Sequence, residues 1–398
     1  MYDAIVVGAR CAGSPTAMLL ARKGYRVLLV DRATFPSDIL STHYIHQPGV
    51  AQLARWGLLE PVVASNCPPI TRALCDFGPF ALTGSAPPAG EVAEAYCPRR
   101  TILDKILVDA AVAAGAELRP GFSVQEILAD GERVSGIRGR GASGGPVTEQ
   151  ARIVIGADGL RSVVARAVQA PTYHERPTLT CGYYSYWSGV PDEGVELYPR
   201  DGRAILAFPT NDGLLCLAVQ WLHHEFHAFR ADVEGNFLQT LELAPGLAER
   251  VRGGRREERF LGTADLPNFF RKPYGPGWAL VGDAGYHKDP HTGEGITDAF
   301  RDAELLADAI DAGLAGRQPL DEALADYERR RNAVAMPLYE LTCELASLQP
   351  PPPERQRFFA ALRGNQAETD RFFGTIAGTV PVQEFYSEEN VQRIVSAA

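Results

Sequence analysis

The first thirty-one residues contain the feature that most constrains the fold of this chain. Residues 3–8, DAIVVG, form a short apolar run, which is typical of a buried parallel strand. A glycine-containing turn, GARCAG (8–13), follows, and residues 14–24 then place apolar side chains at helical spacing and end on a glycine. Residues 25–31, YRVLLVD, form a second buried strand that ends in an acid. This order predicts a βαβ unit and therefore an α/β protein with a parallel sheet.

The turn and the terminal acid favour nucleotide binding. In a βαβ unit, the backbone N–H groups of the first turn and the helix N-terminus face a pyrophosphate. Asp31 lies eighteen residues after Gly13, close to the spacing of about 20 expected for an acid that binds a ribose hydroxyl. Arg10 replaces the middle glycine of G-x-G-x-x-G, and its guanidinium either binds the phosphates directly or points to solvent. A nucleotide-free α/β protein with a chance turn is the alternative.

The rest of the chain alternates between helical and extended patterns. The apolar periodicity predicts helices over 48–60, 101–115, 228–251 and 296–313. Strands are expected at 117–119, 122–128, 133–138, 151–156, 180–190, 204–209 and 214–221, with GRGASGGP (139–146) as a hairpin tip or loose loop. We therefore expect a discontinuous domain into which a β-rich domain is inserted. Their bounds are 1–70, 97–171 and 272–345 for the first, 71–96 and 172–271 for the second, and 346–398 for a C-terminal helical segment.

Composition excludes several classes of protein. Hydrophobic residues make up 45% and charged residues 22% of the 398 residues, which is the balance of a globular protein. The net charge of −10 is unlike a nucleic-acid-binding surface. Seven scattered cysteines without C-x-x-C spacing predict neither a disulfide framework nor a metal site, and His223 and His227 lack a third ligand. No signal peptide or membrane span is expected, so we predict a cytoplasmic monomer or homodimer.

Four motifs together resemble a known superfamily. They are the N-terminal turn, RRTILDKIL (99–107), IGADGLRSVVAR (155–166) and GWALVGDAGYHKDPHTGEGITDAF (277–300). In order and spacing they are similar to the FAD-dependent flavoprotein monooxygenases of the para-hydroxybenzoate hydroxylase type (group A), and to the related geranylgeranyl reductases. The resemblance implies a Rossmann-like FAD-binding domain, an inserted β-sheet substrate domain and a C-terminal helical segment, with FAD as cofactor.

The resemblance also implies roles for individual residues. Gly8, Arg10, Gly13 and Ser14 would line the pyrophosphate, Asp31 and Arg32 the adenosine, and Val124 the adenine. Arg100 would contact the diphosphate or the ribityl chain, and Asp283, after Gly282, would hold the ribityl hydroxyls. Asp158 would touch the FAD and the path of the nicotinamide nucleotide.

The last motif has a physical reason of its own. Gly293 and Gly295 leave bare backbone before a helix that starts near Ile296, so its N–H groups and positive dipole end can lie against the flavin pyrimidine ring. Reduced flavin carries negative charge there, so this placement stabilises the reduced state. Pro290 stiffens the loop beside the ring. An ordinary glycine-rich helix start is the alternative.

The resemblance favours a monooxygenase. In such enzymes NAD(P)H docks transiently as reductant, and reduced flavin takes up O₂ as a C4a-hydroperoxide that oxygenates a small aromatic or polycyclic substrate, often in secondary metabolism. An ene reductase of the geranylgeranyl reductase type is the alternative, since HTGEGITDA (291–299) has reductase wording, although FPSDILSTHYIH (35–46) lacks the expected cysteine-containing stretch. A tryptophan-type halogenase is disfavoured by YYSYWSGVP (183–191), which lacks the paired-tryptophan motif. A non-catalytic redox sensor is the remaining possibility.

Histidines and aromatic residues are candidates for chemistry on the substrate. His43 and His46 follow the second strand, and His291 follows Pro290 in the flavin loop, so each is a candidate to deprotonate a phenol or amine. In the strand 180–190, Tyr183 and Trp187 share one face, while Tyr184 and Tyr186 share the other. We name Tyr183 and Trp187 as the candidate substrate contacts, although alternation alone does not say which face meets a pocket.

Overall fold

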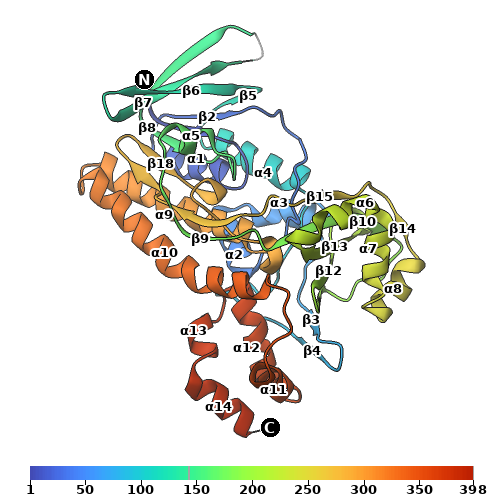
Figure 1. The fold of residues 1–398 in the computed structure, drawn as a ribbon. Coiled ribbons are helices and arrows are strands. Elements are labelled where there is room, and N and C mark those ends of the chain that lie inside the picture. The colour runs from blue at the N-terminus through green and yellow to red at the C-terminus, as the bar shows by residue number, and fades with distance from the viewer. Residues whose placement is uncertain (142–143, 398) are drawn as a thin grey trace.

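The computed structural model describes residues 1–141 and 144–397 and shows a mixed α/β fold (Figure 1). The central sheet has the strand order β17-β18-β8-β1-β2-β5, and the β6–β7 hairpin joins it through β8. Strands β1, β2, β5, β8 and β18 run parallel, which confirms the α/β prediction. Their bounds are β1 Tyr2–Val7, β2 Val27–Asp31, β5 Glu117–Pro120, β6 Ser123–Asp130, β7 Arg133–Arg140, β8 Pro146–Gly156, β17 Tyr274–Gly275 and β18 Trp278–Leu280.

Strand β1 is central because both of its faces are apolar. Ala4 and Val6 belong to a core beneath helices α1, α4 and α9, while Ile5 and Val7 belong to a second core beneath the β6–β7 hairpin and α5. All four residues are buried, as the uninterrupted apolar run predicts. The helices are α1 Gly13–Arg22, α4 Arg100–Ala113, α5 Val163–Ala167 and α9 Gly295–Leu314, and α10 Leu320–Leu345 packs along α9.

A second sheet forms the β-rich unit, with the order β14-β10-β13-β12-β11-β3-β4 and with β15 paired to β10. Helices α6, α7 and α8 cover one of its faces, as Figure 1 shows. The strands are β3 Ala73–Asp76, β4 Ala81–Gly84, β10 Thr180–Ser188, β11 Val195–Arg200, β12 Arg203–Pro209, β13 Leu215–Leu222, β14 Arg255–Arg256 and β15 Leu261–Thr263. The helices are α6 Phe226–Ala231, α7 Val233–Leu241 and α8 Pro245–Arg252.

A small three-stranded sheet, in the order β19-β16-β9, lies against α10. Its strands are β9 Thr172–Arg176, β16 Asn268–Arg271 and β19 Tyr286–His287. Phe270 and Tyr286 of this sheet pack against Tyr339 of α10. The sheet therefore anchors both chain segments that lead between the two larger sheets.

The C-terminal segment forms four helices that pack on β3 and β4, away from the first sheet (Figure 1). They are α11 Pro353–Leu362, α12 Gln366–Ala377, α13 Val382–Phe385 and α14 Glu388–Ser396. Gln366 donates to the Thr83 carbonyl at 3.0 Å, and Asp370 accepts from the Ser85 backbone N–H at 2.9 Å. These bonds fix α12 to the β4 edge.

Two local predictions were wrong, and one long helix was not predicted. The helix expected over 48–60 breaks at Gly57, whose φ of 77° is left-handed, into α2 Gln47–Trp56 and α3 Leu59–Ala64. The helix expected over 228–251 is three helices, because Asp232 caps α7 with its side chain and Pro245 begins α8. The 26-residue helix α10 was not anticipated. Part of the expected tip at 139–146 lies outside the described residues.

Two further observations concern the described residues as a whole. None of the helices in residues 1–141 and 144–397 combines the length and apolar character needed to cross a membrane. Within the same ranges, no three His, Cys, Asp or Glu side chains converge as a metal-binding group.

Candidate active site

The turn between β1 and α1 is closed so tightly that only glycine fits. A Cβ on Gly13 would lie 1.7 Å from the Gly8 carbonyl oxygen, and a Cβ on Gly8 would lie 2.4 Å from the Ala157 carbonyl oxygen. Gly8 also has a φ of 103°, in the left-handed region. The first turn of α1 has no side-chain cap, and the Ser14 hydroxyl oxygen is buried without a hydrogen-bond partner among the described residues. The N-terminus of α1 and the Ser14 hydroxyl therefore offer hydrogen-bond donors at one place, which is an arrangement that binds anions.

Asp31 ties the end of β2 to this turn. Its carboxylate accepts from the backbone N–H of Ala9 at 2.7 Å and from that of Ala33 at 2.8 Å. Arg32 is exposed beside it. Val124 lies near the same strand end, because the Phe122 N–H bonds the Asp31 carbonyl and Val124 packs against the core that contains Val30. The structure thus brings the predicted adenosine contacts together.

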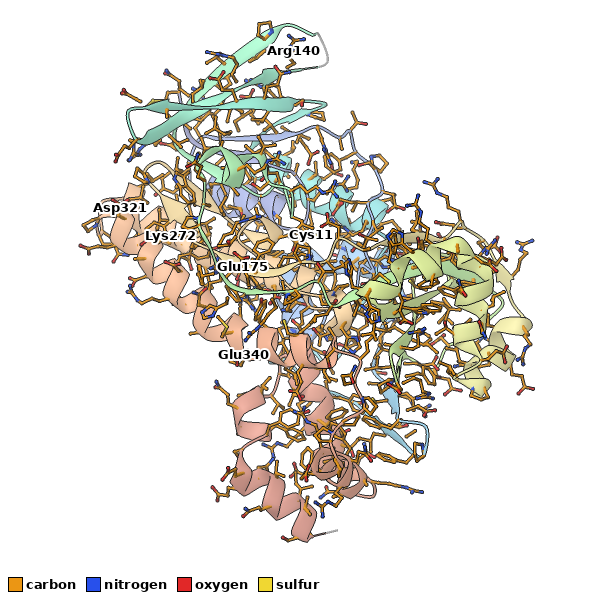
Figure 2. The ribbon with its side chains drawn as sticks, viewed as in Figure 1. Cys11, Arg140, Glu175, Lys272, Asp321 and Glu340 are labelled. Atoms are coloured by element: carbon orange, nitrogen blue, oxygen red, sulfur yellow. The ribbon has the colours of Figure 1, made fainter. Side chains whose placement is uncertain are left out.

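Arg10 is held inside the molecule rather than pointing to solvent. Its guanidinium donates to the Asp104 carboxylate at 2.5 Å and to the Ser37 hydroxyl at 2.9 Å. Asp104 is fully buried and also accepts from Arg100 at 3.0 and 3.1 Å. The Cys11 thiol, labelled in the interior in Figure 2, donates to the same carboxylate at 3.4 Å. Asp104 therefore positions both arginines.

Asp104 was not predicted as a site residue, although the sequence contains a signal for it. Asp104 is the acid of the R-x-x-L-D motif and lies four residues after Arg100 on α4, so an i, i+4 ion pair was readable from the sequence. Its second partner, Arg10, lies 94 residues earlier and is joined to it only by the fold.

Two acids predicted to meet the cofactor differ in their surroundings. Asp283 is exposed. Burial acts against the charge of Arg100, but the carboxylates of Asp104 and Asp283 raise its pKa, so Asp283 lies within electrostatic reach of Arg100. Asp158 is half-buried and accepts at 2.6 Å from the N–H of Val163, the first residue of α5. Burial raises the pKa of Asp158, and one of its oxygens lacks a partner among the described residues.

The loop before α9 combines a short 3₁₀ turn with an open helix start. The turn spans Pro290–Thr292, Gly293 follows with a φ of 71°, and α9 begins at Gly295, one residue before the predicted Ile296. Among the described residues, no side chain caps this helix, and none has an atom within 4 Å of a Cβ built on Gly295. The first N–H groups of α9 therefore face open space that a ring can occupy.

His46 and Glu294 form a buried pair behind this loop. His46 Nε2 lies 2.8 Å from the Thr292 carbonyl oxygen, so this nitrogen carries the proton. Burial lowers the pKa of His46 to about 4. The Glu294 carboxyl lies 3.5 Å from the same nitrogen, and its Oε1 has no hydrogen-bond partner among the described residues. Burial and the neighbouring Asp298 raise the pKa of Glu294. Glu294 was not predicted as a site residue from the sequence.

His43 and His291 are both neutral but are placed differently. His43 is buried with Nδ1 3.0 Å from the Cys97 carbonyl and Nε2 2.8 Å from the Tyr186 hydroxyl. Burial lowers its pKa to about 3, and both of its nitrogens are occupied, so the geometry favours a packing role. His291 bonds Gln220 Oε1 through Nδ1 at 2.8 Å. Burial lowers its pKa to about 4, and its Nε2 is left as an acceptor.

A largely apolar pocket begins at this loop. Pro290, His291, Thr292 and Gly293 line one end together with His46. The walls come from the second sheet and the C-terminal segment, and include Tyr44, Val195, Leu197, Leu206, Phe208 and Phe373. The structure therefore brings His46, Pro290 and His291 together at one pocket, whereas His43 does not line it.

Tyr183 and Trp187, which we named as candidate substrate contacts, do not line this pocket. Trp187 stacks on Phe237 with ring centroids 5.6 Å apart, and Tyr183 packs edge-on against Phe229 at 4.9 Å. Both belong to the core between the sheet and helices α6–α8. The opposite face, with Tyr184 and Tyr186, packs toward Tyr44 and Phe208 instead.

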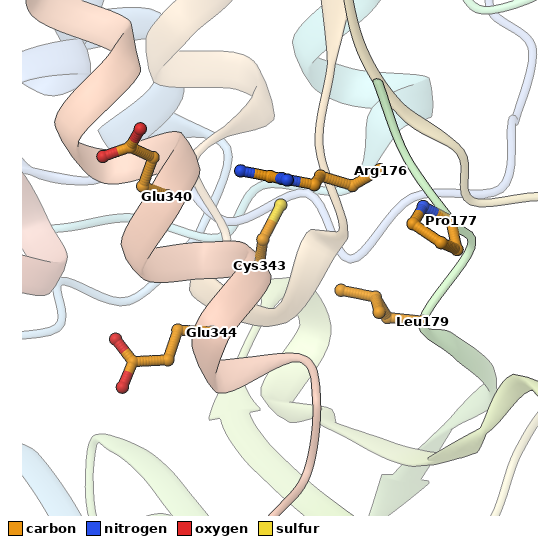
Figure 3. Close-up of a pocket in the computed structure, with 6 residues that line it drawn as sticks. All are labelled: Arg176, Pro177, Leu179, Glu340, Cys343 and Glu344. Atoms are coloured by element: carbon orange, nitrogen blue, oxygen red, sulfur yellow. The ribbon is translucent and has the colours of Figure 1, made fainter. Parts of the chain in front are cut away.

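A second hollow of about 330 Å³ lies between β9 and α10 (Figure 3). Arg176, Pro177 and Leu179 lie on one side, and Glu340, Cys343 and Glu344 of α10 on the other. Its walls contain an exposed cation and two acids. Burial raises the pKa of the Cys343 thiol to about 11, so this thiol stays protonated at neutral pH. This hollow does not include any of the predicted site residues.

Comparisons with known proteins agree with this geometry. A family model described as "FAD binding domain" matches residues 1–213. The chain is 30% identical over 311 residues to a digeranylgeranylglycerophospholipid reductase 2 of Methanopyrus kandleri, covering 74% of this chain and 73% of the relative. It is 26% identical over 367 residues to a kynurenine 3-monooxygenase of Salinispora arenicola, covering 81% and 77%.

A solved structure supports the same fold. The structure of a myxobacterial chondrochloren halogenase, a FAD-dependent enzyme, superposes with a TM-score of 0.81 at 21% identity and covers 100% of this chain and 96% of that one. The chain therefore belongs to the FAD-binding domain family of flavoproteins. It is a FAD-dependent oxidoreductase, and FAD is its cofactor.

The described residues fit this cofactor. A closed glycine turn, the unpartnered Ser14 hydroxyl and the open helix start at Gly295 are what a diphosphate and a flavin ring require. Asp283 is exposed and within reach of Arg100, so it is available to ribityl hydroxyls.

Proposed function

We propose that this chain is a monooxygenase that uses NAD(P)H and O₂ to oxygenate a small, mostly apolar molecule, aromatic or polycyclic. The observation that carries the proposal is the apolar pocket that opens against the loop Pro290–Gly293, directly before the open start of α9. Bound FAD would supply the electron transfer and the activation of O₂.

Different residues of the chain would bind different parts of FAD. The turn at Gly8 and Gly13 would hold the diphosphate, with Ser14 at the helix N-terminus. Asp104 would hold Arg10 and Arg100 beside it. Asp31 would bind the ribose, and the dipole of α9 would stabilise negative charge near its first turn.

The pocket residues would exclude water and orient the substrate. Tyr44 and Phe208 meet edge-on with ring centroids 5.8 Å apart and form an aromatic part of the wall. His291 would accept a phenol or amine proton at Nε2, because Nδ1 donates to Gln220 and so fixes the ring. Of the three predicted histidines, we therefore propose His291 as the proton acceptor, with His46 positioning the loop through Thr292.

The division into domains follows the same proposal. Residues 1–70, 97–171 and 272–345 would form the FAD-binding domain, and 71–96 with 172–271 the substrate domain. The C-terminal segment, 346–398, would complete the pocket, because Phe373 and Ile376 of α12 line it.

An ene reductase is the second candidate function. HTGEGITDA (291–299) has the wording of prenyl-lipid reductases, and one relative is named as such a reductase at 30% identity. An apolar pocket also suits a prenyl chain. Halogenation is a third outcome to test, since a FAD-dependent halogenase shares the fold.

Labelled oxygen separates these reactions. The purified holoenzyme is given NADH or NADPH and a panel of phenols, polycyclic aromatics and prenyl lipids under ¹⁸O₂, with chloride and bromide present. One ¹⁸O atom in the product is the expected result. A saturated prenyl product formed without O₂ would instead identify a reductase, and a halogenated product a halogenase. Parallel reactions in H₂¹⁸O under unlabelled O₂ control for exchange with solvent.

A further inference from the structure

The pocket before α9 has an unusual balance of charge. Among the described residues that line it, Arg72 is the one side chain with a formal charge. His46 and His291 also line it, but burial lowers their pKa to about 4, so both are neutral at pH 7. Most of the remaining wall is aliphatic or aromatic. An apolar cavity with a single cation matches an apolar molecule that carries a single negative charge.

Arg72 is free to meet such a ligand. Its side chain is exposed, and no ion pair within residues 1–141 and 144–397 includes it. Nearby arginines differ, because Arg200 pairs with Asp76 at 3.2 Å and Arg203 pairs with Glu225 at 2.6 Å. The backbone of Arg72 is nevertheless fixed, since its carbonyl accepts from the Val195 N–H at 3.0 Å. The backbone therefore holds Arg72 at the pocket, while no neighbouring carboxylate among the described residues neutralises its charge.

The C-terminal segment supplies the wall that makes the pocket selective. Phe373, Ile376 and Ala377 of α12 line the same cavity as Arg72 and the flavin loop. Helix α12 packs directly on the end of β4, because a Cβ on Gly84 would lie 3.1 Å from the Phe373 side chain. The apolar wall is thus a fixed part of the site.

We infer that this pocket selects an apolar molecule with one carboxylate or similar anionic group, which Arg72 binds. Helix α12 covers the apolar body. The net charge of the chain is −10, so an anion gains nothing from the overall field and depends on this local cation. The inference rests on the proposed function in that the pocket is the substrate site, but not on which reaction the enzyme performs.

The direct test compares two probes that differ only in charge. Binding of 2-naphthoate and of neutral 2-naphthamide to the FAD-loaded enzyme is measured by titration calorimetry. We expect naphthoate to bind about two- to fivefold more tightly, the range for an ion pair at an exposed site. The preference should shrink as salt rises, because exposed charges are screened.

Variants then assign the preference to Arg72. Arg72→Gln should abolish it, and Arg72→Lys should retain most of it. Arg230→Gln is the matched control, because Arg230 is also exposed but lies on α6, on the helix-covered face of the sheet. Phe373→Ala should weaken both probes about equally, since it removes part of the apolar wall.

The outcomes are separable from those of the oxygen experiment. Equal binding of both probes, binding of neither, or a preference that survives Arg72→Gln would overturn the inference. A reductase or halogenase result with labelled oxygen would leave the charge preference intact, because calorimetry does not depend on turnover.

Discussion

Replacing Asp104 with alanine is expected to destabilise the FAD-binding region strongly. Asp104 is fully buried and accepts two hydrogen bonds from Arg100, which itself is only 8% exposed. Without the carboxylate, the Arg100 guanidinium stays buried and loses its partner. Breaking one side of a buried ion pair costs about 3–5 kcal/mol. The Arg10 side chain is 18% exposed and can turn outward, so most of the cost comes from Arg100.

The assay is urea unfolding of the holoenzyme, followed by tryptophan fluorescence and by release of flavin. Asp109→Ala is the matched control, because Asp109 lies on the same helix and pairs with Lys105 at 2.5 Å, but both side chains are largely exposed. Its loss should cost less than about 1 kcal/mol. A double variant, Arg100→Met with Asp104→Leu, should recover most of the stability, since apolar side chains can replace a buried pair.

Equal destabilisation by the two alanine variants would refute this reasoning. If Asp104→Ala and Asp109→Ala destabilise the protein equally, Asp104 is not the buried anchor of the two arginines. Flavin release should also occur earlier in Asp104→Ala than in the control, because Arg10 and Arg100 flank the closed turn that contains Gly8 and Gly13.

Two further predictions concern the second sheet. Trp187→Ala should cost about 3–5 kcal/mol of stability but leave probe binding to the folded enzyme unchanged, because Trp187 stacks on Phe237 in the helix-covered core; a large loss of probe affinity would contradict this placement. The folded pKa of His43, about 3, lies below the value of about 6.5 expected for an unfolded chain, so His43 binds its proton more readily when unfolded. The stabilising contribution of neutral His43 to the free energy of unfolding is therefore present above pH 6.5 and is lost as pH falls toward 3. Between pH 6.5 and 5, the wild type should lose up to ~2 kcal/mol more stability than His43→Gln. Urea unfolding at each pH measures this difference, and parallel pH profiles would refute it.

Local patterns were sufficient where the structure depends on neighbours in the chain. The apolar run of β1, the glycines at 8 and 13 and the acid at 31 are each read within a few residues, and they predicted the βαβ unit. The start of α9 was predicted to within one residue for the same reason, because Gly293 and Gly295 act through their own backbone.

Alternation along β10 determined less. It predicted that Tyr183 and Trp187 share a face, and the structure places both in one core. It did not say which face meets the pocket, because that depends on where residues 226–252 fold back. Those residues form α6–α8 and cover the face with Trp187, which leaves the other face, with Tyr186, toward His43.

The sequence by itself determined the class of domain and the cofactor turn, because strand and helix periodicity and glycine conformations are local properties. The tertiary structure decided the partners of Arg10 and the composition of the pocket. Asp104 lies 94 residues from Arg10, and Phe373, near the C-terminus, lines the same pocket as Arg72. Such contacts arise when distant elements bury their apolar faces together, so no spacing along the chain records them.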